Sequence, residues 1–199
     1  DEDIGVVTRP FYQFEFDPKI PIRYWPPPST KKDIIITINS SKKLIEAAVA
    51  ATYLVSCCAF RAKYIDTLFT SHVFTSQCYV FFSIFKKHKV LFLKDYIVGV
   101  RVYSSQCRFK PSIYRPSPVA TWNEVFNKVL PEKKYERVRK ICQNYTAQNY
   151  VGLVQIKNWA NMRYLIEEIF MHIKYRKASL IDKRFWFYSS ISLFTPRII

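Results

Sequence analysis

Lysine and arginine recur at spacings that could align with an anionic partner. Lys133, Arg137 and Lys140 follow one another at i, i+4 and i+7, which places them on one face of a helix. Lys134 and Arg139 lie beside this row. Such cations can contact successive phosphates of a nucleic acid, and each contact adds affinity that depends on salt and not on base sequence. The spacing is equally typical of a solvated helix face, so both interpretations stay open.

Two other basic clusters are candidate binding sites. Lys86, Lys87 and Lys89 fall in the segment "KKHK", where we expect a turn that either binds an anion or is simply solvated. The third cluster combines cations with aromatic residues: Arg176, Lys177, Lys183 and Arg184, beside Phe185, Trp186 and Tyr188. Aromatic rings next to arginine can stack on unpaired bases of RNA. The run "FWFY" is also typical of a hydrophobic core.

Other kinds of chemistry lack local support. The histidines His72, His88 and His172 are isolated, without the spacing of metal ligands. Glu167 and Glu168 are adjacent on a predicted helix, so their side chains point about 100° apart, and we expect solvated surface charges. No short motif pairs a cysteine with a histidine for nucleophilic catalysis. We therefore predict no metal, no cofactor, no small-molecule substrate and no enzyme activity.

The scarcity of glycine points the same way. The chain has three glycines, Gly5, Gly99 and Gly152, whereas an average protein contains about 7% glycine. Phosphate-binding loops and nucleophile elbows need glycine where the backbone turns sharply or approaches a ligand. Since the three are far apart in the sequence, neither nucleotide-binding glycine motif can form.

The charge is strongly positive and unevenly distributed. The 199 residues include 31 Lys and Arg against 15 Asp and Glu, a formal net charge of +16. Residues 1–40 contain five bases and six acids, residues 41–116 contain twelve and three, and residues 117–199 contain fourteen and six. A field of this sign concentrates polyanions, which favours RNA, an anionic membrane surface or an acidic protein as partner. Lysines that only maintain solubility are the alternative.

The cysteines suggest a reducing compartment. Cys57, Cys58, Cys78, Cys107 and Cys142 form no C-x-x-C motif, and an odd number cannot all pair within the chain. We expect reduced, mostly buried thiols and an intracellular location, mitochondrial or otherwise organellar, with a viral particle as the alternative. Because the sequence starts at Asp1 and not at Met, we expect a processed chain or part of a longer one.

The first 32 residues are expected to be an extended arm. They contain six of the eleven prolines, including the triproline 26–28, and show no helical or strand period. We predict that the fold begins at Asp33, and that deletion of residues 1–28 leaves the body folded but weakens assembly. The predicted docking residues of the arm are Phe11, Tyr12, Phe14, Tyr24 and Trp25.

Residues 33–110 are predicted to be an α/β core. "DIIITI" at 33–38 is typical of a buried strand, and residues 42–64 should form one buried helix after the capping residues 39–41. Strands are expected at about 78–85 and 90–103. The uncharged stretch 67–85 is nearly long enough to span a bilayer, but eight of its nineteen residues are polar, so a buried strand is the preferred interpretation.

After the proline-rich segment 111–118, residues 117–199 are predicted to be mainly helical and packed on the core. Thr121 and Glu124 form a capping box, Pro131 suits the start of a second helix, and a third is expected over about 158–177. The tail 183–194 is expected to be a strand or buried segment. The fold class is thus α+β, with a small mixed sheet and one buried helix before the helical part.

These observations favour a non-catalytic protein that binds RNA within a large assembly, with the general character of proteins in organellar ribosomes. One alternative is a matrix-like or nucleocapsid-associated viral structural protein on an anionic membrane or RNA. Another is an accessory subunit of a membrane protein complex, in which residues 67–85 contact other subunits. Salt-sensitive RNA binding, flotation with anionic liposomes and a need for detergent would distinguish the three.

Overall fold

A computed structural model describes residues 1–25, 32–66, 75–102 and 111–197. It contains mixed sheets and many helices, which confirms the predicted α+β class. Contacts divide the chain into two compact units: unit 1 comprises residues 1–105 and 128–142, and unit 2 comprises residues 106–127 and 143–199. The chain therefore passes between the units three times.

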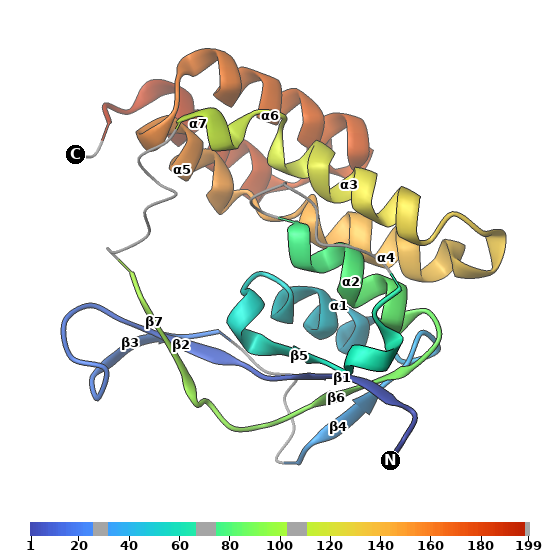
Figure 1. Ribbon diagram of the computed structural model, residues 1–199. Coiled ribbons are helices and arrows are strands. Elements are labelled where there is room, and N and C mark those ends of the chain that lie inside the picture. The colour runs from blue at the N-terminus through green and yellow to red at the C-terminus, as the bar shows by residue number, and fades with distance from the viewer. Residues whose placement is uncertain (26–31, 67–74, 103–110, 198–199) are drawn as a thin grey trace. The chain divides into compact units, whose positions relative to one another are not determined.

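The first sheet of unit 1 joins strands from distant parts of the sequence. It contains β1 (Ile4–Thr8), β4 (Ile34–Ile36), β5 (Cys58–Phe60) and β6 (Lys89–Phe92), in the order β4-β6-β1-β5 (Figure 1). Strand β1 pairs in parallel with β6 and antiparallel with β5, while β4 pairs antiparallel with β6. β1 is thus an interior strand, and its Val6 is 1% exposed. The predicted strand at 33–38 is confirmed as β4.

The second sheet holds the aromatic residues of the N-terminal segment. It contains β2 (Phe11–Phe14), β3 (Pro21–Tyr24) and β7 (Val98–Arg101), in the order β3-β2-β7. The ring of Phe11 stacks on that of Trp25, with centroids 5.7 Å apart, and Tyr24 meets Tyr96 edge to face at 4.9 Å. These rings pack within their own unit.

The prediction of an extended arm over residues 1–32, with the fold beginning at Asp33, is therefore wrong. Phe11, Tyr12, Phe14 and Tyr24 lie in strands, and the amide of Trp25 donates a hydrogen bond to the carbonyl of Phe11. The prolines are compatible with strands here, because Pro10 and Pro18 lie between strands and Pro21 is the first residue of one. At these positions no backbone N–H is needed for hydrogen bonds between strands. The triproline 26–28 lies outside the described residues.

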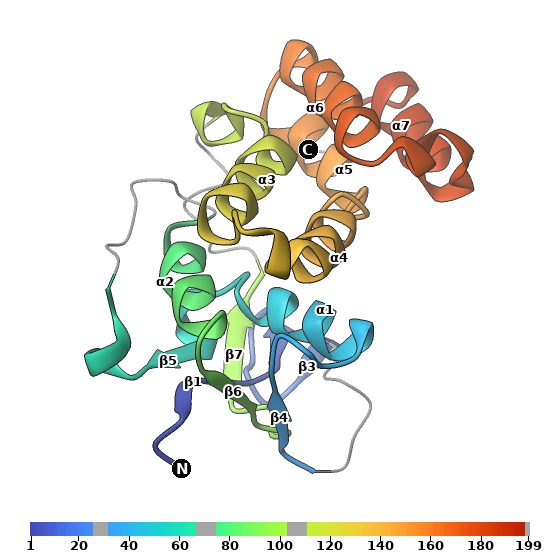
Figure 2. The ribbon, with the colours of Figure 1, turned by 90° about the vertical axis from the view of Figure 1, so that its right-hand side faces the viewer.

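Two helices of unit 1, α1 (Lys42–Ala51) and α2 (Ser76–Phe85), lie on one side of the strands (Figures 1 and 2). The predicted strand at 78–85 is wrong, because these residues belong to α2. All residues from Gln77 to Phe85 are buried, so no polar face marks a helical period. α2 packs closely on β1 at Gly5, where a Cβ atom would collide with the side chains of Ile84 and His88.

Two other predicted elements of unit 1 are shorter than expected. The helix expected over 42–64 ends at Ala51 and is followed by the 3-10 turns η1 (Val55–Cys57) and η2 (Ala62–Tyr64), on either side of β5. The strand expected over 90–103 is two strands, β6 and β7, which belong to different sheets.

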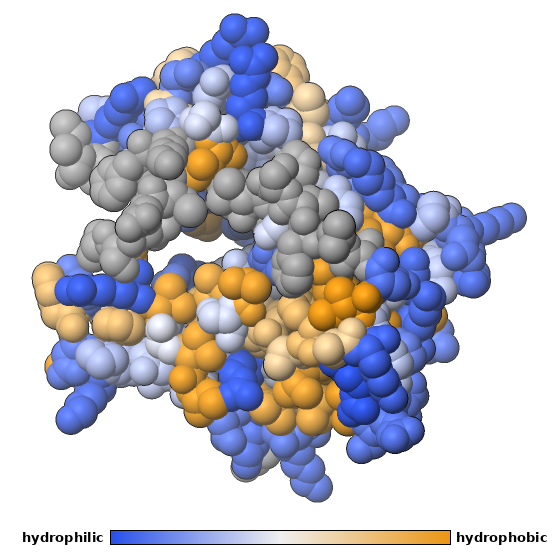
Figure 3. Space-filling view, in the orientation of Figure 1, coloured by the Kyte–Doolittle hydropathy of each residue, from blue (hydrophilic) through white to orange (hydrophobic). Residues whose placement is uncertain are grey.

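In the view of Figure 3, apolar surface lies over β1 and β5 and is interrupted by hydrophilic residues.

The described elements of unit 2 are helical. Helix α3 (Pro118–Val129) ends, and α4 (Glu136–Thr146) begins, within the segment assigned to unit 1, where η5 (Lys133–Tyr135) joins them. The other elements are η4 (Pro111–Tyr114), α5 (Val151–Trp159), α6 (Met162–Tyr175), η6 (Lys177–Ile181) and α7 (Lys183–Phe194). α5 contacts both α6 and α7. Helices were expected at α3, α4 and α6, and these are confirmed.

Three details of unit 2 differ from expectation. Ser117 caps α3, because its hydroxyl accepts a hydrogen bond from the amide of Ala120, whereas the Thr121 hydroxyl donates to the carbonyl of Ser117. Helix α5 was not predicted as a separate element. The tail expected as a strand or buried segment is helix α7.

In the part of the chain that the structure describes, no helix is both long and apolar enough to cross a bilayer.

Candidate functional site

The turn at 86–89 joins α2 to β6, and its cations face nearby carboxylates. Lys87 Nζ lies 3.1 Å from Asp66, and Lys89 Nζ lies 3.4 Å from Asp1 and 3.2 Å from Asp3. The side chains of Lys89 and His88, through hydrogen bonds and charge, lower the pKa of Asp3. The N-terminal acids thus compensate much of the charge predicted to bind an anion here. Lys86 is half-buried, and its carbonyl accepts a hydrogen bond from Tyr135.

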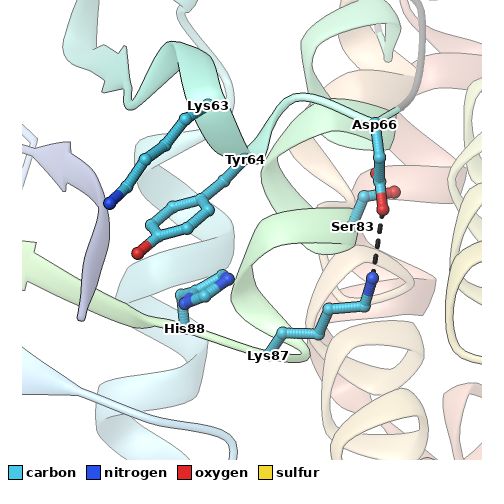
Figure 4. A pocket seen from close by; sticks show the side chains of 6 residues that line it. All are labelled: Lys63, Tyr64, Asp66, Ser83, Lys87 and His88. Carbon is cyan, nitrogen blue, oxygen red and sulfur yellow. Dashed lines mark hydrogen bonds and ion pairs between the residues drawn. The ribbon is translucent and has the colours of Figure 1, made fainter. Parts of the chain in front are cut away.

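A pocket of about 240 Å³ opens beside this turn (Figure 4). It is lined by Lys63, Tyr64, Asp66, Ser83, Lys87 and His88. The rings of Tyr64 and His88 are stacked with centroids 3.7 Å apart, and Lys87 reaches across to Asp66. An anionic ligand in this pocket would compete with Asp66 for Lys87, and because the ion pair is exposed, an anion-binding role of Lys87 stays a prediction.

The arginines of the predicted basic helix face at 133–140 form hydrogen bonds within unit 1 itself. Arg137 donates to the carbonyls of Ile38 and Ser40 at 3.3 and 2.9 Å, and thereby ties α4 to the loop after β4. Arg139 donates to the carbonyl of Leu130 at 2.6 Å. These arginines therefore satisfy carbonyl groups of their own unit, a use that their spacing does not reveal.

The lysines of the same row are only partly available. Lys134 Nζ lies 2.6 Å from Glu132, and Lys140 Nζ lies 2.6 Å from Glu136, one helical turn away. Lys133 is exposed, and no carboxylate among the described residues pairs with it. Since exposed ion pairs are weak, a polyanion could still compete for these cations, and their binding role stays a prediction.

The third predicted cluster forms an exposed corner of unit 2 between η6 and α7. We call it the basic corner and define it as Lys177, Lys183, Arg184, Trp186 and Phe187. All five are exposed, with Trp186 at 48% and Phe187 at 59%. The structure brings together cations and aromatic rings here as predicted, but Phe185 is fully buried and cannot meet a partner. Phe187, which the sequence argument did not select, is exposed in its place.

A partly buried hydrogen-bond network holds this corner in place. Asp182 caps α7 by accepting a hydrogen bond from the amide of Arg184 at 3.1 Å. The same carboxylate accepts from the hydroxyl of Tyr150 at 3.2 Å and lies 3.3 Å from the guanidinium of Arg176. Ser179 lies 3.1 Å from the Tyr150 hydroxyl. Arg176, predicted to bind a polyanion, is therefore a structural partner of Asp182 and Tyr150.

Glu168 and His172 form a buried pair on α6 that the sequence argument missed. Glu168 is 3% exposed, so the prediction of a solvated surface charge is wrong. Its Oε1 accepts a hydrogen bond from the amide of Val119 at 3.1 Å, at the start of α3, and lies 3.9 Å from His172 Nε2. His172 Nδ1 lies 2.9 Å from the carbonyl of Ala147, so Nδ1 carries the proton. Their spacing with Leu165, on one helix face, was the available signal.

Burial sets the protonation of this pair. Desolvation raises the pKa of Glu168 to about 7 and lowers that of His172 to about 4. Near neutral pH, His172 is uncharged and Glu168 is poised between its two forms. Glu168 Oε2 has no hydrogen-bond partner among the described residues, which further disfavours the ionised form.

Metal and thiol chemistry has little basis in the described residues. Within them, no group of three or more His, Cys, Asp and Glu side chains could hold a metal ion. Cys57, Cys58, Cys78 and Cys142 are free thiols, and burial raises the pKa of Cys57 to about 11 and that of Cys58 to about 12. Such thiols stay protonated at neutral pH and are poor nucleophiles. Cys107 lies outside the described residues.

Comparisons with known proteins give no independent guide to this chain. No protein-family model, curated protein or solved structure matches it. The candidate sites therefore rest on their own geometry.

Proposed function

We propose that this protein is a non-catalytic RNA-binding component of a larger assembly, and that its basic corner contacts single-stranded RNA. One observation carries the proposal: Lys177, Lys183 and Arg184 are exposed beside the exposed rings of Trp186 and Phe187. Cations supply phosphate contacts and rings supply stacking platforms, the two interactions on which single-strand binding depends.

The fixed base of the corner supports the proposal. Asp182 is the one carboxylate in the segment 174–187, and it is engaged with Arg176, Arg184 and Tyr150. Around it the segment carries five cations, so the local charge favours a polyanion. Because Phe185 is anchored in the core, Trp186 and Phe187 project from a rigid element and lose little conformational freedom on binding.

The wider setting of the proposal follows from the charge of the whole chain. A net charge of +16 suits an assembly rich in phosphate, such as a ribonucleoprotein. The free thiols of Cys57, Cys58, Cys78 and Cys142 support a reducing, intracellular compartment. In this proposal the other partners are protein subunits of the same assembly.

The test is the binding of fluorescent single-stranded RNA, measured by anisotropy over a series of salt concentrations. The variant Lys177→Ala/Lys183→Ala/Arg184→Ala should bind roughly ten-fold more weakly or worse. The slope of the logarithm of its binding constant against the logarithm of salt concentration should become shallower by about 1 for each lost phosphate contact. Trp186→Leu should weaken binding about 5- to 100-fold with little change in salt dependence, because stacking contributes about 1–3 kcal/mol per base.

The matched control is Lys19→Ala/Lys43→Ala/Lys94→Ala, which removes three exposed cations from unit 1. It should weaken binding no more than about three-fold, as a change of the general field. Equal losses in the two triple variants would contradict the assignment to the corner. Absence of RNA binding by the unaltered protein at low salt would contradict the function itself.

A further inference from the structure

Helix α6 carries a row of large apolar side chains on its outer face. Met162, Ile166 and Phe170 are 49%, 42% and 64% exposed, at i, i+4 and i+8. The opposite face of the helix is buried through Leu165, Glu168 and His172. We call Met162, Ile166 and Phe170 the α6 row. It extends about 12 Å along the helix, and regular exposure of this kind indicates a contact surface.

Helix α7 repeats this pattern in a more pronounced form. Its Ser189 and Ser192 are buried, and their hydroxyls have no hydrogen-bond partner among the described residues, whereas Phe187 and Phe194 are 59% and 83% exposed. The inner face of α7 also buries Phe185, and Phe187 belongs to the basic corner, so Phe194 is the exposed apolar side chain that remains at the end of the helix. The end of α7 at Phe194 therefore suits an apolar environment.

The end of α7 lies near the start of α6. Lys157 at the end of α5 is hydrogen-bonded to Thr195, and Arg197 donates to the carbonyl of Ala160 at 2.8 Å. Phe194 and Met162 are thus presented at the same end of unit 2, opposite along α6 from the basic corner. The apolar surface at this end is distinct from the RNA contact proposed above.

The charges around the α6 row identify the kind of partner. Arg163 and Lys174 are exposed on the same outer face, and Glu167 is the one acid of α6 that is not buried. Unit 2 as a whole has eleven bases and four acids; of the acids, Glu168 is buried and Asp182 lies against arginines. A partner for this face must therefore supply negative charge together with hydrocarbon.

From this combination we infer that the outer face of α6 and the end of α7 dock on an anionic lipid membrane surface. Amphipathic helices bind such surfaces by inserting apolar side chains at the level of the headgroups, with lysine and arginine beside anionic lipids. RNA offers phosphates but no hydrocarbon, and a second copy of this chain would bring a second strongly positive unit against the first. Each cation near the surface should strengthen binding about five-fold.

The test is flotation of the full chain with lipid vesicles. The protein should float with phosphatidylcholine vesicles that contain about 30% phosphatidylserine and not with pure phosphatidylcholine. The variant Met162→Gln/Ile166→Gln/Phe170→Gln should bind roughly ten-fold more weakly or worse, because it removes apolar surface without changing charge. The matched control, Val55→Gln/Ile65→Gln/Ile97→Gln, alters exposed apolar residues of unit 1 and should float like the unaltered protein.

Several outcomes would overturn the inference. Flotation of the α6 row variant equal to that of the unaltered protein would assign membrane binding to charge alone. Failure of the unaltered protein to float would remove the membrane as partner, and a dimer that only the α6 row variant disrupts would replace it with a second copy. Because charge is unchanged, the α6 row variant should bind RNA normally, so this inference and the proposed RNA function fail separately.

Discussion

At the scale of single residues, the Glu168–His172 pair links folding to pH. Glu168 has a folded-state pKa above its ordinary value, so the stability it contributes is present at low pH and is lost as pH rises from about 4.5 through about 7. His172 has a lowered pKa, so its contribution is present above about 6.5 and is lost as pH falls through about 4. Between about pH 4.5 and 6.5 the two contributions change the free energy of unfolding with pH in opposite directions, and they nearly cancel.

Substitution of either partner should reveal how the other one makes the free energy of unfolding depend on pH. Relative to the unaltered protein, Glu168→Gln should make the free energy of unfolding rise more steeply with pH, by about 1.4 kcal/mol per pH unit between pH 4.5 and 7. His172→Gln should shift the slope by a similar amount in the opposite direction between pH 4 and 6.5. Urea unfolding at a series of pH values measures both changes.

Glu167→Gln is the control, because it removes the neighbouring carboxyl, which is not part of the buried pair. Parallel stability curves for Glu168→Gln and the unaltered protein would show that Glu168 titrates alike in the folded and unfolded chain. Residue type alone could not reveal this pair, since a glutamate in an adjacent Glu-Glu sequence is usually solvated. Only its spacing from Leu165 and His172 indicates the buried face.

At the scale of elements, the two buried serines of α7 can be tested directly for missing hydrogen bonds. Ser189→Ala and Ser192→Ala should be neutral or stabilising by up to about 1 kcal/mol, because each removes a buried hydroxyl without a hydrogen-bond partner. The control Ser179→Ala removes a buried hydroxyl that contacts Tyr150, and should cost about 1 kcal/mol. Thermal unfolding compares the three, and clear destabilisation by the first two changes would mean that their hydroxyls are satisfied.

Sequence patterns predicted elements well where one face is polar. Strand β4 and helices α3, α4 and α6 follow their predicted positions, because each has a local signal in apolar spacing or terminal residues. Helices α2 and α7 were missed for a shared reason. α2 is buried on nearly all sides, and α7 has aromatic residues and serines on both its buried and its exposed face, so neither shows the usual contrast between faces.

The candidate sites were predictable in location but not in use. Sequence placed cations and aromatic residues together at the basic corner, which the structure retains. It could not tell that Arg137 satisfies the carbonyls of Ile38 and Ser40, or that Arg176 belongs to the network of Asp182. Such roles depend on contacts between residues far apart in the chain, and local spacing carries no information about them.

At the scale of the whole molecule, the N-terminal segment should be essential for the fold of unit 1. Deletion of residues 1–8 removes the interior strand β1, which leaves β5 with no partner strand and β6 paired with β4 alone. We expect loss of cooperative unfolding in unit 1, measured by circular dichroism and by hydrogen exchange of β6. The opposite expectation followed from the arm interpretation, so the experiment separates the two.

Substitutions in the same segment provide the control. Phe16→Ser and Ile20→Ser alter side chains that are 78% and 66% exposed, and should change stability by no more than about 0.5 kcal/mol. A truncated protein that unfolds as cooperatively as the full chain would restore the arm interpretation.

The parallel pairing of β1 with β6 also has a consequence during synthesis. Ile4 is made before its partner Lys89, which follows roughly 85 residues later, and at about 5–20 residues per second the delay is several seconds. For that time the nascent β1 has neither its parallel neighbour nor the cover of α2. We expect slow, non-local folding of unit 1 and a nascent chain that engages chaperones until β6 emerges.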